Sequence, residues 1–219
     1  MKNINFFSLC RSGHHAVIFW LINNLGGCEE ETHLQKYTNI ETGLVYYNNI
    51  GVYKPTFPKK YNWLITNTED QEFISGENNI VIVRDFYNLL ASRYKKYGEL
   101  LGLREKDYIT NLQNLVATWK QHAKVLLAFP EKGISYNFWL KGKSYRDSVA
   151  SRFGIPNEVD NINYVPSIGG GSSFVGVQKE KDIESYLHRY KQIELPENIA
   201  GEIAADKELE DFNLALHNL

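Results

Sequence analysis

The segment Cys10–Ala16 combines residue types that bind anions. Arg11 carries a permanent positive charge, and the small residues Ser12 and Gly13 follow it directly. If a helix begins after Gly13, its first backbone N–H groups have no helical partner and lie at the positive end of the helix dipole. A phosphate or phosphosulfate group could accept several hydrogen bonds there. A Ser-Gly pair before a helix is also common in ordinary turns, so this segment alone does not show whether the chain binds an anion.

A second group of polar residues follows the apolar run Asn79–Val83. This run is rich in β-branched residues, which is typical of a buried parallel strand, and Arg84 stands at its end. Asp85 is suited to cap a following helix, in which Ser92 lies two turns on. The arginine and the serine can converge on one anion. A surface serine and a structural Arg84–Asp85 ion pair would explain the same residues.

Two other phosphate-handling motifs are excluded by spacing. The chain contains no G-x-x-x-x-G-K-S/T pattern, so the lysine and the magnesium-binding hydroxyl of a P-loop are missing. A cysteine phosphatase needs an arginine in the loop after its nucleophile, whereas the residue at that distance after Cys10 is Ala16. We therefore expect Cys10 to be a small residue at a strand end rather than a nucleophile.

The strands and helices that would position Arg11, Arg84 and Ser92 alternate along the chain. We expect strands at 4–10, 44–47, 62–66, 79–83 and 133–139, and helices at 14–25, 85–97, 109–127, 143–153 and near the C-terminus. This alternation predicts an α/β fold in three layers, with a mainly parallel β-sheet flanked by helices. A single domain, 1–219, is the simplest organisation for a chain of 219 residues.

Taken together, the two arginine-containing segments resemble the sulfotransferases that use 3′-phosphoadenosine 5′-phosphosulfate (PAPS). The Arg-Ser-Gly loop is similar to the family pattern Lys/Arg-Ser-Gly-Thr-Thr, and Arg84 with Ser92 matches the family's strand-end arginine and later serine in order and spacing. The segments Ile134–Asn137 and Phe153–Pro156 resemble the family more loosely. The resemblance implies a sulfotransferase with the P-loop-like architecture of that family.

The resemblance also implies how the chain would hold PAPS. Arg11 would contact the sulfuryl-bridging region, and Arg84 and Ser92 would bind the 3′-phosphate. The backbone groups that would bind the 5′-phosphate belong to Ser12, Gly13, His14, His15 and Ala16.

Three features depart from the family pattern. His14 and His15 replace the usual hydroxyl residues, so their contacts would come from imidazole N–H groups or only from the backbone. Asn137 stands where many relatives have a glutamate. The late Arg-Lys-Gly triplet that often completes the cofactor site is missing.

The glycine-rich stretch 168–176 could take the place of the missing triplet. Its glycines permit close backbone approach, Ser172 and Ser173 could donate to phosphate, and Phe174 could cover the adenine. A plain flexible connector explains the same composition equally well.

The catalytic assignments are Arg11, Glu31 and His15. Arg11 would stabilise the charge that develops on the leaving phosphate, so the scheme requires no metal. A neutral hydroxyl acceptor needs a general base. Glu31 resembles the acid of a Glu-Glu-Thr segment in tyrosylprotein sulfotransferases, His15 stands beside the anion, and Glu69 just beyond a predicted strand is a third candidate. A solvated acidic turn would also explain Glu31.

Spacing of the histidines predicts no metal site. His33, His188 and His217 show no metal-ligand pairing, and the adjacent His14 and His15 lack an evident third ligand. His122 shares the apolar side of a predicted helix, and we expect it to be a satisfied core residue.

The charge, the apolar stretches and the cysteine count indicate which partners and which cell compartment to expect. With 24 Lys and Arg against 26 Asp and Glu, the net charge of −2 provides no basic field for nucleic acid. No apolar stretch reaches the ~18 residues of a membrane span, and the N-terminus lacks the pattern of a secretory signal. The two cysteines suggest a reducing compartment, so we expect a cytoplasmic protein with a small-molecule or carbohydrate acceptor.

Two alternatives remain open on the sequence alone. One is a P-loop-like phosphotransferase with an unusual loop, which would use a nucleoside triphosphate and magnesium. The other is a catalytically inactive protein that keeps the fold and binds a nucleotide or another anion. Nothing in the sequence determines the oligomeric state.

Overall fold

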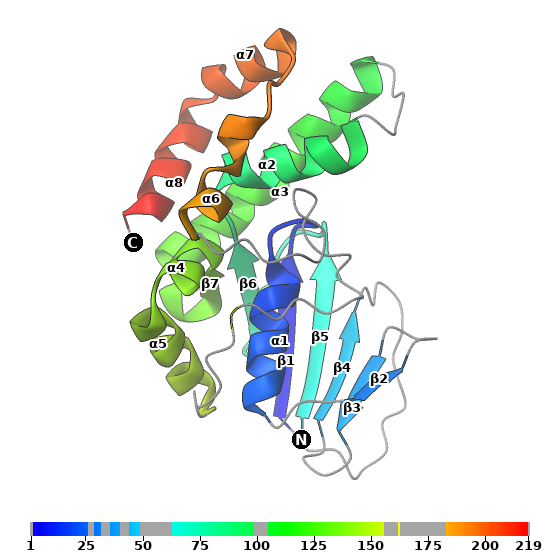
Figure 1. Ribbon diagram of the computed structural model, residues 1–219, viewed down its shortest axis with the longest axis vertical. Coiled ribbons are helices and arrows are strands. Elements are labelled where there is room, and N and C mark those ends of the chain that lie inside the picture. The colour runs from blue at the N-terminus through cyan, green and yellow to red at the C-terminus, as the bar shows by residue number, and fades with distance from the viewer. Residues whose placement is uncertain are drawn as a thin grey trace.

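A computed structural model describes residues 2–25, 29–31, 36–39, 44–48, 63–98, 105–155, 162 and 183–218 of the chain. Its strands are β1 (Lys2–Ser8), β2 (Glu29–Glu31), β3 (Lys36–Asn39), β4 (Leu44–Asn48), β5 (Trp63–Glu69), β6 (Asn79–Val83) and β7 (Gly133–Ser135). They form one sheet in the order β2-β3-β4-β5-β1-β6-β7 (Figure 1). Neighbours from β4 to β7 run parallel, whereas β2, β3 and β4 pair antiparallel at one edge. The predicted α/β fold with a mainly parallel sheet is confirmed.

The helices that flank the sheet come mostly from the second half of the chain. They are α1 (His14–Asn24), α2 (Phe86–Arg93), α3 (Glu105–Ala128), α4 (Tyr136–Lys141), α5 (Lys143–Phe153), α6 (Ile183–Leu187), α7 (Glu197–Ala205) and α8 (Lys207–His217). A π-helical turn, Tyr94–Gly98, extends α2, and the 3₁₀ turns Pro130–Lys132 and Arg189–Gln192 precede β7 and follow α6. The predicted helices at 143–153 and at the C-terminus are confirmed.

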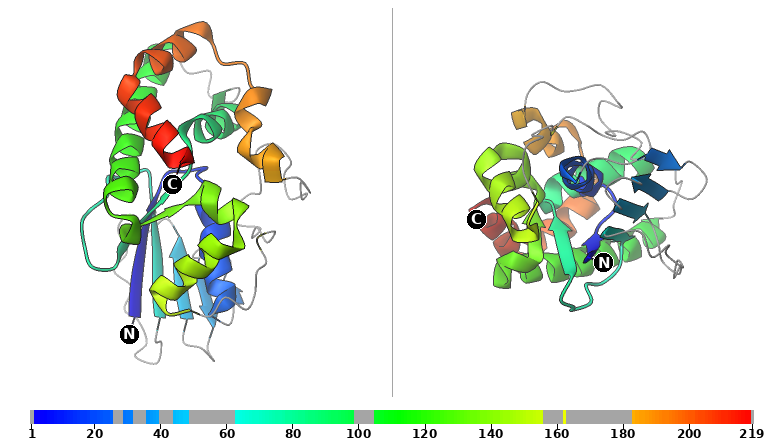
Figure 2. Two further views of the ribbon diagram at one scale, coloured as in Figure 1. Left: turned by 90° about the vertical axis from the view of Figure 1, so that its left-hand side faces the viewer. Right: turned by 90° about the horizontal axis from the view of Figure 1, so that it is seen from below.

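Two apolar cores lie on the two faces of the sheet because side chains alternate along each strand. Phe6 and Ile82 pack on one face with α1, α4 and α5, whereas Phe7 and Val81 pack on the other with α2, α3, α7 and α8. Figure 2 shows α1 and α3 on opposite sides of the sheet. Helices therefore cover both faces, which is compatible with the predicted three layers.

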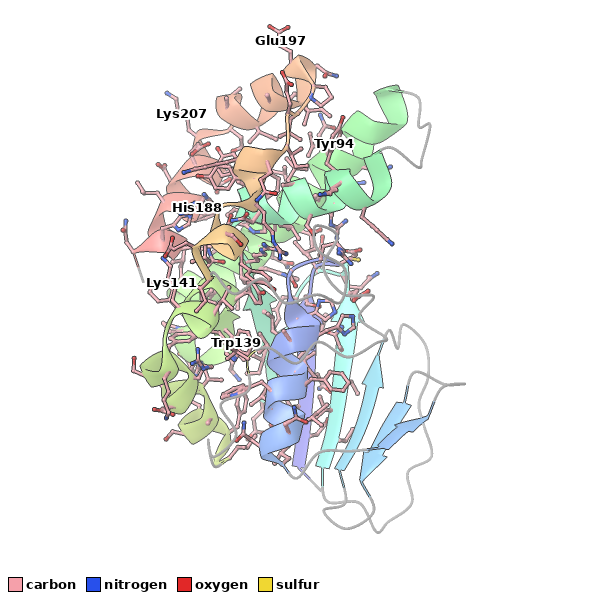
Figure 3. All side chains as sticks on the ribbon, in the orientation of Figure 1. Tyr94, Trp139, Lys141, His188, Glu197 and Lys207 are labelled. Atoms are coloured by element: carbon pink, nitrogen blue, oxygen red, sulfur yellow. The ribbon has the colours of Figure 1, made fainter. Side chains whose placement is uncertain are left out.

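Helix α1 is buried nearly all round, as its composition predicts. Each residue from Ala16 to Ile22 is at most 9% exposed. Its Trp20 meets Trp139 of α4 edge-to-face, with ring centroids 6.0 Å apart. Figure 3 labels Trp139 beside α1. This contact packs the middle of α1 against α4.

The strand predicted at 133–139 is wrong beyond residue 135. The chain turns into α4 at Tyr136, and the Ser135 hydroxyl caps that helix by accepting a hydrogen bond from the Phe138 amide at 3.4 Å. Trp139 and Leu140 then face the core formed with α1. Apolar residues over this short length fit either a strand or a helix, and the serine cap selects the helix.

The observed ends of two other strands differ from the predicted ends by one to three residues. β1 begins at Lys2 and ends at Ser8, and β5 extends to Glu69. The glycine-rich stretch 168–176, with Ser172, Ser173 and Phe174, lies outside the described residues. Within the described part of the chain, no helix is both long and apolar enough to cross a membrane.

Candidate functional site

The loop between β1 and α1 has the backbone shape of an anion-binding concavity. Arg11 has φ 73° and Gly13 has φ 83°, so left-handed residues occur at alternate positions just before the helix. Alternation of this kind turns successive N–H groups toward one point. The Gly13 position provides no side-chain cap, and the first turn of α1 contains no acidic residue. Two amides predicted to bind the 5′-phosphate donate within the backbone instead, Ser12 to the Leu9 carbonyl at 2.9 Å and Ala16 to the Gly13 carbonyl at 3.0 Å. The N–H groups of Gly13, His14 and His15 are the ones suited to a ligand.

Glycine at position 13 is required by space as well as by conformation. An added Cβ would lie 2.3 Å from Cε2 of Tyr136, the first residue of α4. Tyr136 is itself buried and stacks on Trp139, with ring centroids 5.8 Å apart. The loop consequently lies tightly against α4.

A turn after β5 braces the loop from the opposite side. Asp70 accepts a hydrogen bond from the Cys10 amide at 3.0 Å, and its own amide donates to Ser8 at 2.9 Å. Arg93 of α2 pairs with the same carboxylate and donates from Nε to the Cys10 carbonyl at 3.0 Å. Sequence reasoning identified neither Asp70 nor Arg93 as part of the site, because both contacts join segments that are distant in the sequence.

The two segments singled out by sequence meet in the structure. Arg11 Nε donates to the Ser92 hydroxyl at 3.4 Å, and Arg84 Nη1 donates to the Arg11 carbonyl at 3.3 Å. Arg84 is 4% exposed and Ser92 is 3% exposed, so neither is a surface residue. The structure thus brings Arg11, Arg84 and Ser92 together at the ends of neighbouring strands β1 and β6.

Arg84 is held by backbone and aromatic groups. Its second amino group, Nη2, donates to the Tyr186 carbonyl at 3.2 Å, and its guanidinium lies 5.3 Å from the ring centre of Tyr136. Burial lowers the pKa of Arg84, whereas Tyr136 and Asp85 oppose this shift and the charges of Arg189 and Arg11 add to it. Positive charge is therefore concentrated in a desolvated place, where an anion would be stabilised.

Asp85 does not form the ion pair with Arg84 that was considered from sequence. As predicted, it caps α2, accepting from the Asn88 amide at 2.9 Å. It also accepts from the side chains of Asn88 at 3.0 Å and Asn137 at 2.9 Å. Among the described residues, no ion pair joins Arg84 and Asp85. Asn137 thus connects α4 to the carboxylate next to Arg84, a role visible only in three dimensions.

His14, His15 and Glu69 form a second polar group beside the loop. The parallel register pairs Ser8 with Glu69, which places the end of β5 next to the start of α1. Glu69 Oε1 lies 2.6 Å from His14 Nε2 and 3.8 Å from His15 Nε2, and His14 Nδ1 lies 3.3 Å from the Ser12 hydroxyl. The premise that these histidines lack a nearby third ligand is therefore wrong.

His15 is unsuited to act as a strong base. Burial lowers its pKa to about 3, with His14 and Arg11 acting in the same direction and Glu69 opposing them. The imidazole is therefore neutral near pH 7, and its conjugate acid is strong.

Glu31 is far from the loop in the sheet. It ends β2, and three strands separate β2 from β1. Four inter-strand spacings amount to about 19 Å across the sheet. The structure therefore brings Glu69, and not Glu31, to the loop.

Two further histidines are described by their contacts, His33 lies outside the described residues, and His122, expected to be a satisfied core residue, has a buried Nδ1 without a hydrogen-bond partner among the described residues. His122 is buried on α3 and hydrogen-bonds through Nε2 to the Gln71 carbonyl at 2.9 Å. His188 is exposed and lies 3.2 Å from Glu184, its neighbour one helical turn earlier.

Comparison of the chain with protein-family models, with curated proteins and with solved structures finds no match in any of the three.

Proposed function

We propose that the chain is a PAPS-dependent sulfotransferase of P-loop-like architecture, which transfers a sulfuryl group to an acceptor hydroxyl. The observation that carries this proposal is the contact of Arg11 with both Ser92 and Arg84. These three residues belong to the two segments that resemble the phosphate-binding parts of that family.

Sheet topology supports a ligand at this place. β1 lies between β5 and β6, and the chain crosses from one side of β1 to the other between these two strands. In open α/β sheets, ligands bind outside the carboxyl ends of the strands at such a switch point. The loop after β1 and Arg84 after β6 occupy those ends.

The residues present fit a donor with two phosphate positions. The backbone N–H groups of Gly13, His14 and His15 would hold the 5′-phosphate at the start of α1. Arg84 and Ser92 would bind the 3′-phosphate, which supplies the negative charge that the buried arginine favours. When bound, PAPS supplies the sulfuryl group.

In this proposal Arg11 stabilises the leaving group and Glu69 is the general base. The Arg11 guanidinium stabilises negative charge on the departing phosphate oxygen without changing its own protonation. Glu69 accepts the acceptor's hydroxyl proton, because its carboxylate lies beside the first turn of α1 and is 15% exposed, whereas the Asp70 carboxylate pairs with Arg93. A hydroxyl of a small molecule or carbohydrate is the proposed acceptor, and two cysteines in 219 residues fit a cytoplasmic enzyme.

A matched pair of arginine variants tests the 3′-phosphate site. Arg84 and Arg146 are both buried and both donate to backbone carbonyls, but Arg146 contacts Trp139 of α4 rather than the loop. Calorimetric titration with 3′-phosphoadenosine 5′-phosphate should show at least about tenfold weaker binding for Arg84→Gln, from the loss of one charged hydrogen bond. Arg146→Gln should bind like the wild type. Equal affinity of the two variants, or preference of the wild type for ATP with magnesium, would contradict the proposal.

A further inference from the structure

The cluster of His14, His15 and Glu69 has the composition of a metal site. One ligand atom from each residue lies within 4.8 Å of the other two. Two imidazole nitrogens and one carboxylate oxygen suit zinc and its neighbours in the first transition row, whereas magnesium and calcium favour oxygen ligands alone. Three protein ligands also match the zinc sites that keep a fourth position open.

One buried nitrogen of each histidine in this cluster has no hydrogen-bond partner among the described residues. His14 is 2% exposed, and among the described side chains its Nε2 has no hydrogen-bond partner. Its 2.6 Å approach to Glu69 Oε1 therefore lacks the direction of a hydrogen bond. His15 Nδ1 is likewise buried without a partner. A buried polar atom without a partner is costly, and a metal ion would satisfy His14 Nε2.

The two distances from Glu69 to the histidine nitrogens are close to those between ligands of one metal ion. Tetrahedral bonds of about 2.0–2.1 Å bring ligand atoms to about 3.3 Å from one another. The observed separations from Glu69 Oε1, 2.6 Å to His14 and 3.8 Å to His15, lie on either side of that value. The three residues come from the end of β5 and the first turn of α1, which the parallel pairing of β1 with β5 holds together.

We propose that His14, His15 and Glu69 bind one divalent transition-metal ion, with zinc as the preferred ion. The positive charge of Arg11 opposes a cation here, and the carboxylate of Glu69 offsets it. A consequence rests on the proposed function: zinc bound to Glu69 lowers the basicity of the carboxylate that would accept the acceptor's proton, so zinc inhibits sulfuryl transfer.

Cobalt(II) titration of the purified full-length protein, without nucleotide, tests the metal site directly. Wild-type protein should develop the visible absorption of tetrahedral cobalt with a stoichiometry of one, and zinc should displace it. Glu69→Gln and His15→Gln should each weaken binding at least about tenfold. His188→Gln removes an exposed histidine that also neighbours a glutamate, and it should titrate like the wild type.

The change in melting temperature on adding zinc is a second measurement, which still tests the metal site if a variant folds poorly. Zinc should raise the melting temperature of the wild type and of His188→Gln, and have no such effect on Glu69→Gln. Absence of a cobalt spectrum in the wild type, or an unchanged titration in Glu69→Gln, would overturn the metal site and leave only a His14–Glu69 contact. Titration with 3′-phosphoadenosine 5′-phosphate is measured separately, so failure of the proposed function is distinguished from failure of the metal site.

Discussion

Gly13→Ala should destabilise the protein more than any other glycine-to-alanine change at a described turn with positive φ. Two costs combine at this position. A left-handed conformation costs a residue with a Cβ about 1–2 kcal/mol. The new methyl group would also lie 2.3 Å from the buried ring of Tyr136, and overpacking of this kind costs about 1–3 kcal/mol. The sum is about 2–5 kcal/mol.

Gly154→Ala provides the matched control for this change. Gly154 has φ 65°, but an added Cβ there would have nothing within 4 Å. It should therefore cost only the conformational term of about 1–2 kcal/mol. Gly201→Ala within α7, where the Cβ also has open space, should stabilise the helix by about 0.5–1 kcal/mol.

Urea unfolding of the three variants measures these differences, provided that the m-values agree. Gly13→Ala should have the lowest midpoint, Gly201→Ala the highest, and Gly154→Ala should lie between the wild type and Gly13→Ala. A Gly13→Ala variant as stable as Gly154→Ala would refute the close packing of the loop against Tyr136, on which the shape of the candidate site depends.

Three further predictions concern pH, the polar network and the proposed base. Burial lowers the pKa of His122 to about 4, so its contribution to stability is complete above pH ~6.5 and is lost as the pH falls toward 4. The loss is on the order of 3 kcal/mol, and His122→Gln should flatten this part of the stability–pH curve measured by urea unfolding. Asn137→Leu removes the amide that donates to buried Asp85 and should destabilise the fold by about 2–3 kcal/mol, measured in the same way; a neutral effect would contradict the network. Glu69→Gln should bind 3′-phosphoadenosine 5′-phosphate normally but lower the rate of sulfuryl transfer at least about 100-fold, and an unchanged rate would exclude Glu69 as the base.

Local sequence patterns predicted the elements that carry the site. The β-branched run Asn79–Val83 matches β6 in both bounds, and the apolar segment after Gly13 matches α1 closely. Arg84 and Ser92 are predicted to converge because Ser92 lies two turns into the helix that follows the strand-end arginine. Their burial and their contact with Arg11 agree with that argument.

Contacts between distant segments could not be predicted in the same way. Glu69 reaches His14 because β5 pairs beside β1, and the sequence does not state which strands are neighbours. Asp70 braces the loop for the same reason. The positive φ of Arg11 is equally hidden, because non-glycine residues rarely adopt it and no motif marks it.

Calorimetric titration of the wild-type protein with 3′-phosphoadenosine 5′-phosphate and with adenosine 5′-phosphate tests the central claim most directly. The two ligands differ only in the 3′-phosphate, which is assigned to Arg84 and Ser92. Two hydrogen bonds to a charged group predict at least about 100-fold tighter binding of the 3′-phosphorylated nucleotide. Equal affinities, or no binding of either nucleotide, would contradict the assignment of this site to PAPS.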